Sequence, residues 1–176
     1  MRTVICSLLI AAIALVLGAG AVIYAGLYDV AATVPHRRVT TWLLETARIR
    51  SIKAQAAGIT VPPGLEEPAK LVIGVEHYAA HCAVCHGAPG VPKGDIGRGL
   101  PPPPELAKTA PLYNPAELFW IVKHGIKMTG MPAWADHSDE ELWATTVAFV
   151  EKLPGMSEQD YARLVMASMA RGGGHH

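Results

Sequence analysis

His81-Cys82-Ala83-Val84-Cys85-His86-Gly87 is the most informative run in this chain of 176 residues. It contains the pattern Cys-x-x-Cys-His, which is typical of a c-type haem attachment site. In such a site the two thiols form thioether bonds to the haem, and the adjacent imidazole is an axial ligand of the iron. Two Cys three residues apart lie on the same side of a helical turn, so both can reach one ring. The run therefore predicts one covalent haem c on Cys82 and Cys85, with His86 bound to its iron.

A candidate for the opposite axial position follows 45 residues after His86. Met131 lies in the run Gly130-Met131-Pro132, and a thioether opposite an imidazole is the ligation of electron-carrying cytochromes. Met128, three residues earlier, is the competing ligand. Pro132 favours Met131, so the predicted metal ligands are His86 and Met131.

The chain is similar to the class I monohaem cytochromes c from about Leu71 to Pro154. Four separated segments carry the resemblance. Gly74 and Tyr78 stand where the family has a small residue and an aromatic at its helix crossing. The others are Pro104-Glu105-Leu106, Ile126 through Trp134 with its Thr-Gly-Met-Pro run, and Ala148-Phe149-Val150.

The resemblance implies a fold and a set of roles. The fold is all-α, a small helical domain wrapped around one haem. Pro104 is the proline that backs His86, although the four prolines from Pro101 to Pro104 leave open which of them does so. With both axial positions filled there is no open site for a substrate, so we expect an electron carrier without catalytic residues.

The first part of the chain has the composition of a membrane anchor. Val4 to Leu27 contains 24 residues without a charge, and about 20 suffice to span a bilayer as a helix. A cleaved signal peptide is the alternative, since Gly18 to Ala21 are small residues, but its apolar region is usually only ~7–15 residues long. The flanking basic residues do not decide the orientation. The resemblance implies that the haem domain lies in the periplasm of a bacterium, anchored by a single pass through the inner membrane, with Met1 in the cytoplasm.

A second helical pattern covers Arg37 to Gln55. Apolar residues recur on one stripe of it, and Arg and Lys occupy the other faces. The stripe consists of Val39, Trp42, Leu43, Ile49 and Ile52. Such a helix can dock on a partner subunit, lie in the lipid headgroup layer or pack on its own domain.

The remaining boundaries follow from turn and cap signals. We expect an anchor at 1–28, an amphipathic helix and Pro-rich linker at 29–66, a cytochrome c domain at 67–155, and a C-terminal helix with a disordered tail at 156–176. Within the domain, helices are predicted from Glu67 to Cys82, from Asn114 to Gly125 and from Ser138 to Leu153. The segment from Gly87 to Pro104 is rich in Gly and Pro and should wrap the haem as a loop with close backbone contacts.

Composition excludes several other classes of protein. The 15 basic and 15 acidic side chains balance, which gives no overall electrostatic case for nucleic-acid binding. Three Cys cannot build a disulfide framework. A zinc site on Cys82, Cys85 and His86 would need a fourth ligand and would leave the Met131 run unexplained. A thioredoxin-like pair would need a βαβ setting, whereas this pattern is helical.

The predicted function is single-electron transfer by the haem in a respiratory or dehydrogenase chain, between a redox protein donor and a redox protein acceptor. No small-molecule substrate is expected. The alternative is a non-catalytic electron-transfer subunit of a larger membrane oxidoreductase complex. A third class, a haem sensor of nitric oxide or carbon monoxide, would require Met131 to be displaced readily.

Overall fold

The structure is a computed structural model that describes residues 1–98 and 101–172. The chain divides into two units, Met1–Val34 and Pro35–His176. The first unit contains α1 (Arg2–Tyr24), a helix with no buried residue. By its length and apolar composition α1 could cross a membrane, which is consistent with the predicted anchor.

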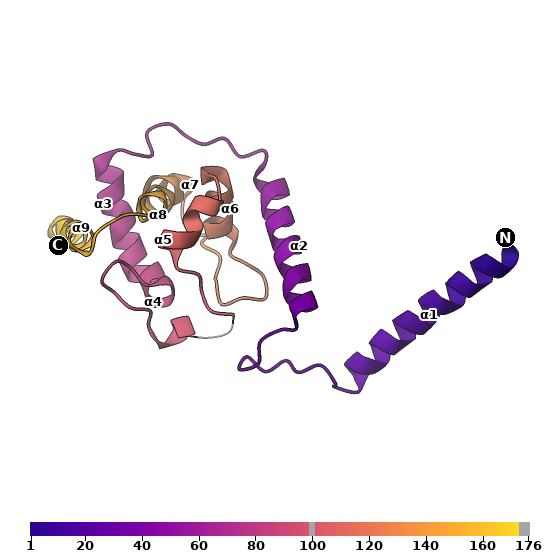
Figure 1. The fold of residues 1–176 in the computed structure, drawn as a ribbon. Coiled ribbons are helices and arrows are strands. Elements are labelled where there is room, and N and C mark those ends of the chain that lie inside the picture. The colour runs from indigo at the N-terminus through magenta and orange to yellow at the C-terminus, as the bar shows by residue number, and fades with distance from the viewer. Residues whose placement is uncertain (99–100, 173–176) are drawn as a thin grey trace. The chain divides into compact units, whose positions relative to one another are not determined.

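The regular elements in the described part of the second unit are helices, joined by loops (Figure 1). No strand occurs within residues 1–98 and 101–172, and their only isolated β-bridge joins Ala88 and Val91. The predicted all-α fold class is confirmed. The α-helices of this unit are α2 (Arg38–Ala56), α3 (Pro68–His77), α4 (Ala83–His86), α5 (Leu106–Thr109), α6 (Pro115–His124), α7 (Asp139–Glu141), α8 (Ala148–Lys152) and α9 (Glu158–Gly172).

Two pairs of these helices are each joined into one continuous helical rod by a π-helical turn. The turn Tyr78–Cys82 joins α3 to α4, and the turn Leu142–Val147 joins α7 to α8. The predicted helices from Glu67 to Cys82 and from Ser138 to Leu153 therefore exist, but each contains a turn with i→i+5 hydrogen bonding. Turns of this kind are rare and occur frequently at functional sites.

The helix ends follow the signals in the sequence. Asn114 accepts a hydrogen bond from the Glu117 N–H, and the Glu117 carboxylate accepts one from the Asn114 N–H, which is a complete capping box. Gly125 ends α6 with a φ of +64°, a conformation that glycine adopts without steric cost. Ser138 caps α7 by accepting from the Glu141 N–H.

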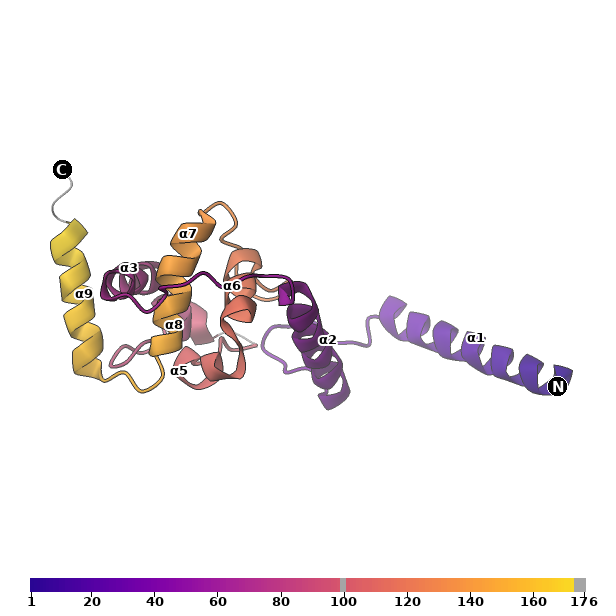
Figure 2. The same cartoon turned by 90° about the horizontal axis from the view of Figure 1, so that it is seen from above.

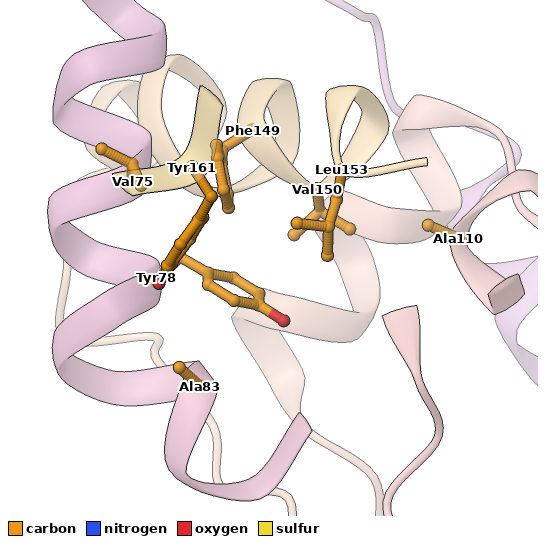
Figure 3. Packing of buried hydrophobic residues seen from close by; sticks show 8 residues of the cluster. All are labelled: Val75, Tyr78, Ala83, Ala110, Phe149, Val150, Leu153 and Tyr161. Atoms are coloured by element: carbon orange, nitrogen blue, oxygen red, sulfur yellow. The ribbon is translucent and has the colours of Figure 1, made fainter. Parts of the chain in front are cut away.

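The principal core lies where α3 crosses α8 (Figure 3). Tyr78 and Phe149 are fully buried, and their ring centroids are 5.0 Å apart. Tyr161 of α9 joins this core, and α9 packs along α3. The small Gly74 is buried on the same helix. The α3–α8 crossing is the arrangement that the resemblance implied for these residues.

A second core fills the space between α6 and the rod from α7 to α8. Phe119 and Trp143 are stacked with their centroids 4.1 Å apart and their planes 3° from parallel. Leu65, from the Pro-rich linker, is buried against the same cluster. The linker is therefore tied to the domain at this point by apolar contact.

α2 packs on α6 through one end only (Figures 1 and 2). Near its C-terminal end Ile52 and Ala56 are buried, whereas Val39 and Trp42 near its start are 75% and 64% exposed. The predicted apolar stripe is thus divided: its last residue packs on the chain's own domain, and its first half is exposed in the structure.

The predicted domain limits at 28, 66 and 155 stay predictions. The predicted helix near the C-terminus is α9, and the last four residues of the predicted tail, 173–176, lie outside the described residues.

Candidate haem site

The two predicted attachment residues lie on consecutive helical segments. Cys82 is the last residue of the π-helical turn, and Cys85 is in α4. Both are free thiols and half-buried. Burial, reinforced by the neighbouring Cys85, raises the pKa of the Cys82 thiol to about 11. At neutral pH the folded chain therefore holds Cys82 as the protonated thiol.

His86 has a defined tautomer. Its Nδ1 lies 2.8 Å from the carbonyl oxygen of Pro104. A carbonyl can only accept, so Nδ1 carries the hydrogen and Nε2 keeps its lone pair. Burial lowers the pKa of His86 and the Lys93 charge lowers it further, against the raising effect of the Pro104 hydrogen bond. The ring is thus held as a neutral imidazole with Nε2 available to a metal.

The hydrogen bond from His86 distinguishes Pro104 from the other three prolines of its run. Lys93 donates from Nζ to the next carbonyl toward the N-terminus, that of Pro103. Two adjacent carbonyls of the Pro-rich segment therefore accept hydrogen bonds from residues at or just after the Cys-x-x-Cys-His run.

The Gly-rich loop after His86 lies against the backbone of that run. The Gly94 N–H donates to the Val84 carbonyl over 2.9 Å, which satisfies one of the free carbonyls at the end of α4. A Cβ on Gly97 would lie 2.6 Å from the Cys85 carbonyl oxygen, closer than real Cβ contacts come. Both glycines thus bring the loop close to the backbone of the attachment run, while the predicted wrapping of the loop around the haem stays a prediction, and Gly99 lies outside the described residues.

Tyr78 closes the attachment segment from the other side. Its buried hydroxyl donates to the Gly87 carbonyl over 2.6 Å. Burial raises the pKa of Tyr78, so the phenol stays protonated and remains a donor at physiological pH. Tyr78 and Gly87, which flank the attachment run on its two sides, are therefore hydrogen-bonded to each other.

Met131 lies on a separate loop that follows α6. The Thr129 hydroxyl donates to the Ile126 carbonyl over 2.7 Å and accepts from the Met131 N–H over 3.1 Å. A Cβ on Gly125 would lie 2.7 Å from the Met131 carbonyl oxygen, so the loop backbone rests directly on the end of α6. The loop therefore has a fixed path, and Met131 is half-buried within it.

Met128 differs from Met131 in both conformation and exposure. It is 87% exposed and has a φ of +62°. Among the non-glycine residues that the structure describes, only Met128 has a positive φ. Such a position is typical of a tight turn that presents its side chain to solvent.

Sequence reasoning did not identify several residues that shape this site. Thr129 was recognised only as part of a loop motif, because its two hydrogen bonds depend on how the loop folds. The Lys93 ammonium group donates to the Pro103 carbonyl. Lys123 bonds Asp139 at the start of α7, and neither contact has a local signal in the sequence.

The residues present fit a c-type haem. Two thiols at the required spacing lie beside a neutral imidazole whose coordinating nitrogen carries a lone pair. The hydrogen bond on the other ring nitrogen is the outer contact that orients histidines bound to metals.

Comparison with known families supports the same assignment. Residues 69–150, just under half of the chain, match the family model described as cytochrome C oxidase, cbb3-type, subunit III. No curated protein and no solved structure matches the chain. The family implies c-type haem, electron transfer and redox partners, and it suggests an electron carrier rather than an enzyme. The match supports a monohaem class I c-type cytochrome domain at residues 69–150, in a chain whose N-terminal apolar helix is consistent with a membrane anchor.

Proposed function

We propose that this chain carries single electrons by means of one haem, bound covalently to Cys82 and Cys85 and ligated by His86 and Met131. The observation that carries the proposal is the hydrogen bond from His86 Nδ1 to the Pro104 carbonyl, within a Cys-x-x-Cys-His run. It fixes the tautomer that a proximal histidine needs, before any metal is considered.

The residues around the proposed haem have separate roles. The bound haem supplies a one-electron ferric/ferrous couple. Pro104 holds the His86 ring in one orientation and increases the basicity of its free nitrogen. Thr129 and Gly125 fix the backbone on both sides of the Met131 loop. A histidine and a methionine that fill both axial positions leave no coordination position for a substrate, which favours a carrier over an enzyme.

Periplasmic placement belongs to the same proposal. α1 is long enough to hold the chain in a bacterial inner membrane, and haem attachment in the family that the chain resembles takes place on the periplasmic side. Redox proteins of a respiratory or dehydrogenase chain would then serve as donor and acceptor.

A second candidate function is an electron-transfer subunit within a larger membrane oxidoreductase. Two observations favour it. The matching family is described as a subunit of an oxidase, and the first half of the apolar stripe is exposed on α2, the helix that follows α1 along the chain. This candidate keeps the same haem and changes only the partners.

The haem linkage is tested by denaturing electrophoresis of the membrane fraction followed by a peroxidase stain. Haem should stay on the polypeptide, and replacement of both Cys82 and Cys85 by Ala should remove it. Extraction of the haem by acidic acetone from the unaltered chain would contradict covalent attachment. Proteins that purify with the chain in mild detergent separate the subunit candidate from an independent carrier.

A further inference from the structure

A cluster of metal-binding side chains lies beside the attachment segment, at the end of α3 and the start of α7. His77 is the last residue of α3, and Glu141 is the last of α7, with His137 four residues before Glu141. The three side chains are between 25% and 34% exposed. They are therefore partly removed from water but still reachable by an ion.

The distances within the cluster are short and converge on one atom. His77 Nε2 lies 3.1 Å and His137 Nδ1 lies 3.2 Å from the same oxygen, Glu141 Oε1. All three donor atoms lie within 4.8 Å of one another. Ligands at ~2.1 Å from a tetrahedral ion are separated by roughly 3.4 Å, so two of the three separations are already near that value.

The cluster is held in place by its surroundings. The His137 N–H donates to the Trp134 carbonyl over 3.1 Å, and the ring of His137 meets the Trp134 ring edge-on at 5.5 Å. The Ser138 cap fixes Glu141 at the end of the first turn of its helical rod. On the other side, the buried Tyr78 follows His77 directly and anchors the end of α3. The three ligands thus come from the end of α3 and from the loop and first turn that begin the rod from α7 to α8, whose π-helical turn packs on α3.

The donor chemistry selects a class of ion. Imidazole nitrogens suit zinc, copper and nickel, whereas magnesium and calcium prefer sites made of oxygen atoms. Two histidines and one glutamate, with further positions open to water, form a known ligand set for zinc. His77 and His137 also line a small cavity together with His81 and Cys82, which leaves space beside these two imidazoles.

We propose that His77, His137 and Glu141 bind a divalent transition-metal ion, with Zn²⁺ as the ion to test. This site is separate from the proposed haem ligands and from the zinc alternative raised for Cys82, Cys85 and His86. The ion binds the three side chains directly, through His77 Nε2, His137 Nδ1 and a carboxylate oxygen of Glu141, and each imidazole coordinates it through the lone pair of that nitrogen.

The test is a zinc titration of the haem-loaded full chain in mild detergent, after treatment with a chelator. Isothermal titration calorimetry should show one zinc ion per chain. Glu141→Gln keeps the size and the hydrogen-bonding capacity of the side chain but loses its charge, and His137→Gln removes one nitrogen ligand. Each variant should weaken zinc binding by ~10-fold or more. Unchanged haem absorption and circular dichroism will show that each variant is folded.

Two control variants remove three histidines that lie outside the proposed site. His124→Ala removes an exposed histidine of α6, and a chain with His175→Ala and His176→Ala lacks the two at the C-terminus. Both controls should keep the wild-type zinc affinity. X-ray absorption at the zinc edge, which is separate from the signal of iron, should then show two imidazoles and a carboxylate oxygen.

Two results would overturn the proposal. One is the absence of stoichiometric zinc binding by the unaltered chain. The other is binding that persists in Glu141→Gln and disappears when the C-terminal histidines are replaced.

Discussion

Gly125→Ala should displace the loop that carries Met131. A Cβ at this position would lie 2.6 Å from the carbonyl carbon and oxygen of Pro132, and 2.7 Å from the Met131 carbonyl oxygen. These are backbone atoms, so no side-chain rotation can relieve the contact. The end of α6 and the Met131 loop would have to separate.

The size of the displacement follows from the same distances. Ordinary Cβ contacts begin at 3.4 Å, so the backbone at Pro132 must move by about 0.8 Å, the difference between 3.4 and 2.6 Å, to reach one. The φ of +64° at Gly125 adds roughly 1–2 kcal/mol for any L side chain. Overpacking at such a contact typically costs ~1–3 kcal/mol. We expect a total loss of about 2–5 kcal/mol of unfolding free energy, and a fall in Tm on the order of 10 °C.

The assay has two readouts, because displacement of Met131 and loss of stability are different effects. The ferric haem-loaded chain should lose intensity in the weak sulfur-to-iron absorption toward the red, and its thermal transition should move down. Gly130→Ala is the matched control, since Gly130 precedes Met131 directly yet its Cβ would meet nothing within 4 Å. It should leave the spectrum unchanged and shift stability by no more than ~0.5 kcal/mol. If Gly125→Ala, like the control, kept the absorption and the Tm of the wild type, the reasoning would be refuted.

Met131→Ala should abolish the sulfur-to-iron absorption and lower the reduction potential, while Met128→Ala should leave both nearly unchanged; the opposite pattern would make Met128 the ligand. Ferrous wild-type chain should bind carbon monoxide weakly, and rapid, tight binding would instead favour the sensor class. Because burial raises the pKa of Cys82 to about 11, iodoacetamide should modify this thiol slowly in the folded haem-free chain near pH 8 and faster as the pH approaches 11. In the unfolded chain the thiol ionises from about pH 9, so Cys82 should also lower the free energy of unfolding as the pH rises from about 9 to about 11. The rate of modification is measured by mass spectrometry. Fast modification of the folded chain near pH 8 would contradict both expectations. Replacing Trp42 and Leu43 with Ser removes two exposed apolar side chains, each worth ~1.5–3 kcal/mol if fully buried against a partner subunit. The variant should keep its haem and its membrane attachment but lose co-purifying proteins and electron-transfer rate, and unchanged co-purification would leave α2 as a helix that rests on lipid or on its own domain.

Local signals in the sequence were sufficient to predict most of the helices. The capping box at Asn114, the glycine that ends α6 and the Ser138 cap each act within a few residues, so their effect does not depend on distant parts of the chain. The Cys-x-x-Cys-His run is equally local, which is why the haem could be predicted from seven residues. The π-helical turns could not be predicted this way, because no residue pattern distinguishes them from α-helix.

Contacts between distant residues decided the rest of the site. Four consecutive prolines look alike in the sequence, and only the folded position of the His86 ring distinguishes Pro104. Glu141 lies within the helix predicted from Ser138 to Leu153, yet its Oε1 also lies 3.1 Å from Nε2 of His77, a residue 64 positions earlier. For α2 the helical period predicted an apolar stripe but not that its last residue, Ile52, would be buried while the four before it are exposed.

The bonds that close the loop over the attachment segment bear on the order of events during biogenesis. In a haem-free chain that has already folded, the Cys82 thiol is protonated and half-buried, and the backbone of Cys85 is covered by Gly97. An enzyme that forms the thioether bonds would meet a poor substrate in this state. If Cys82 and Cys85 hold a haem as proposed, attachment would therefore be easier on the unfolded chain, before the Gly-rich loop closes over the attachment segment.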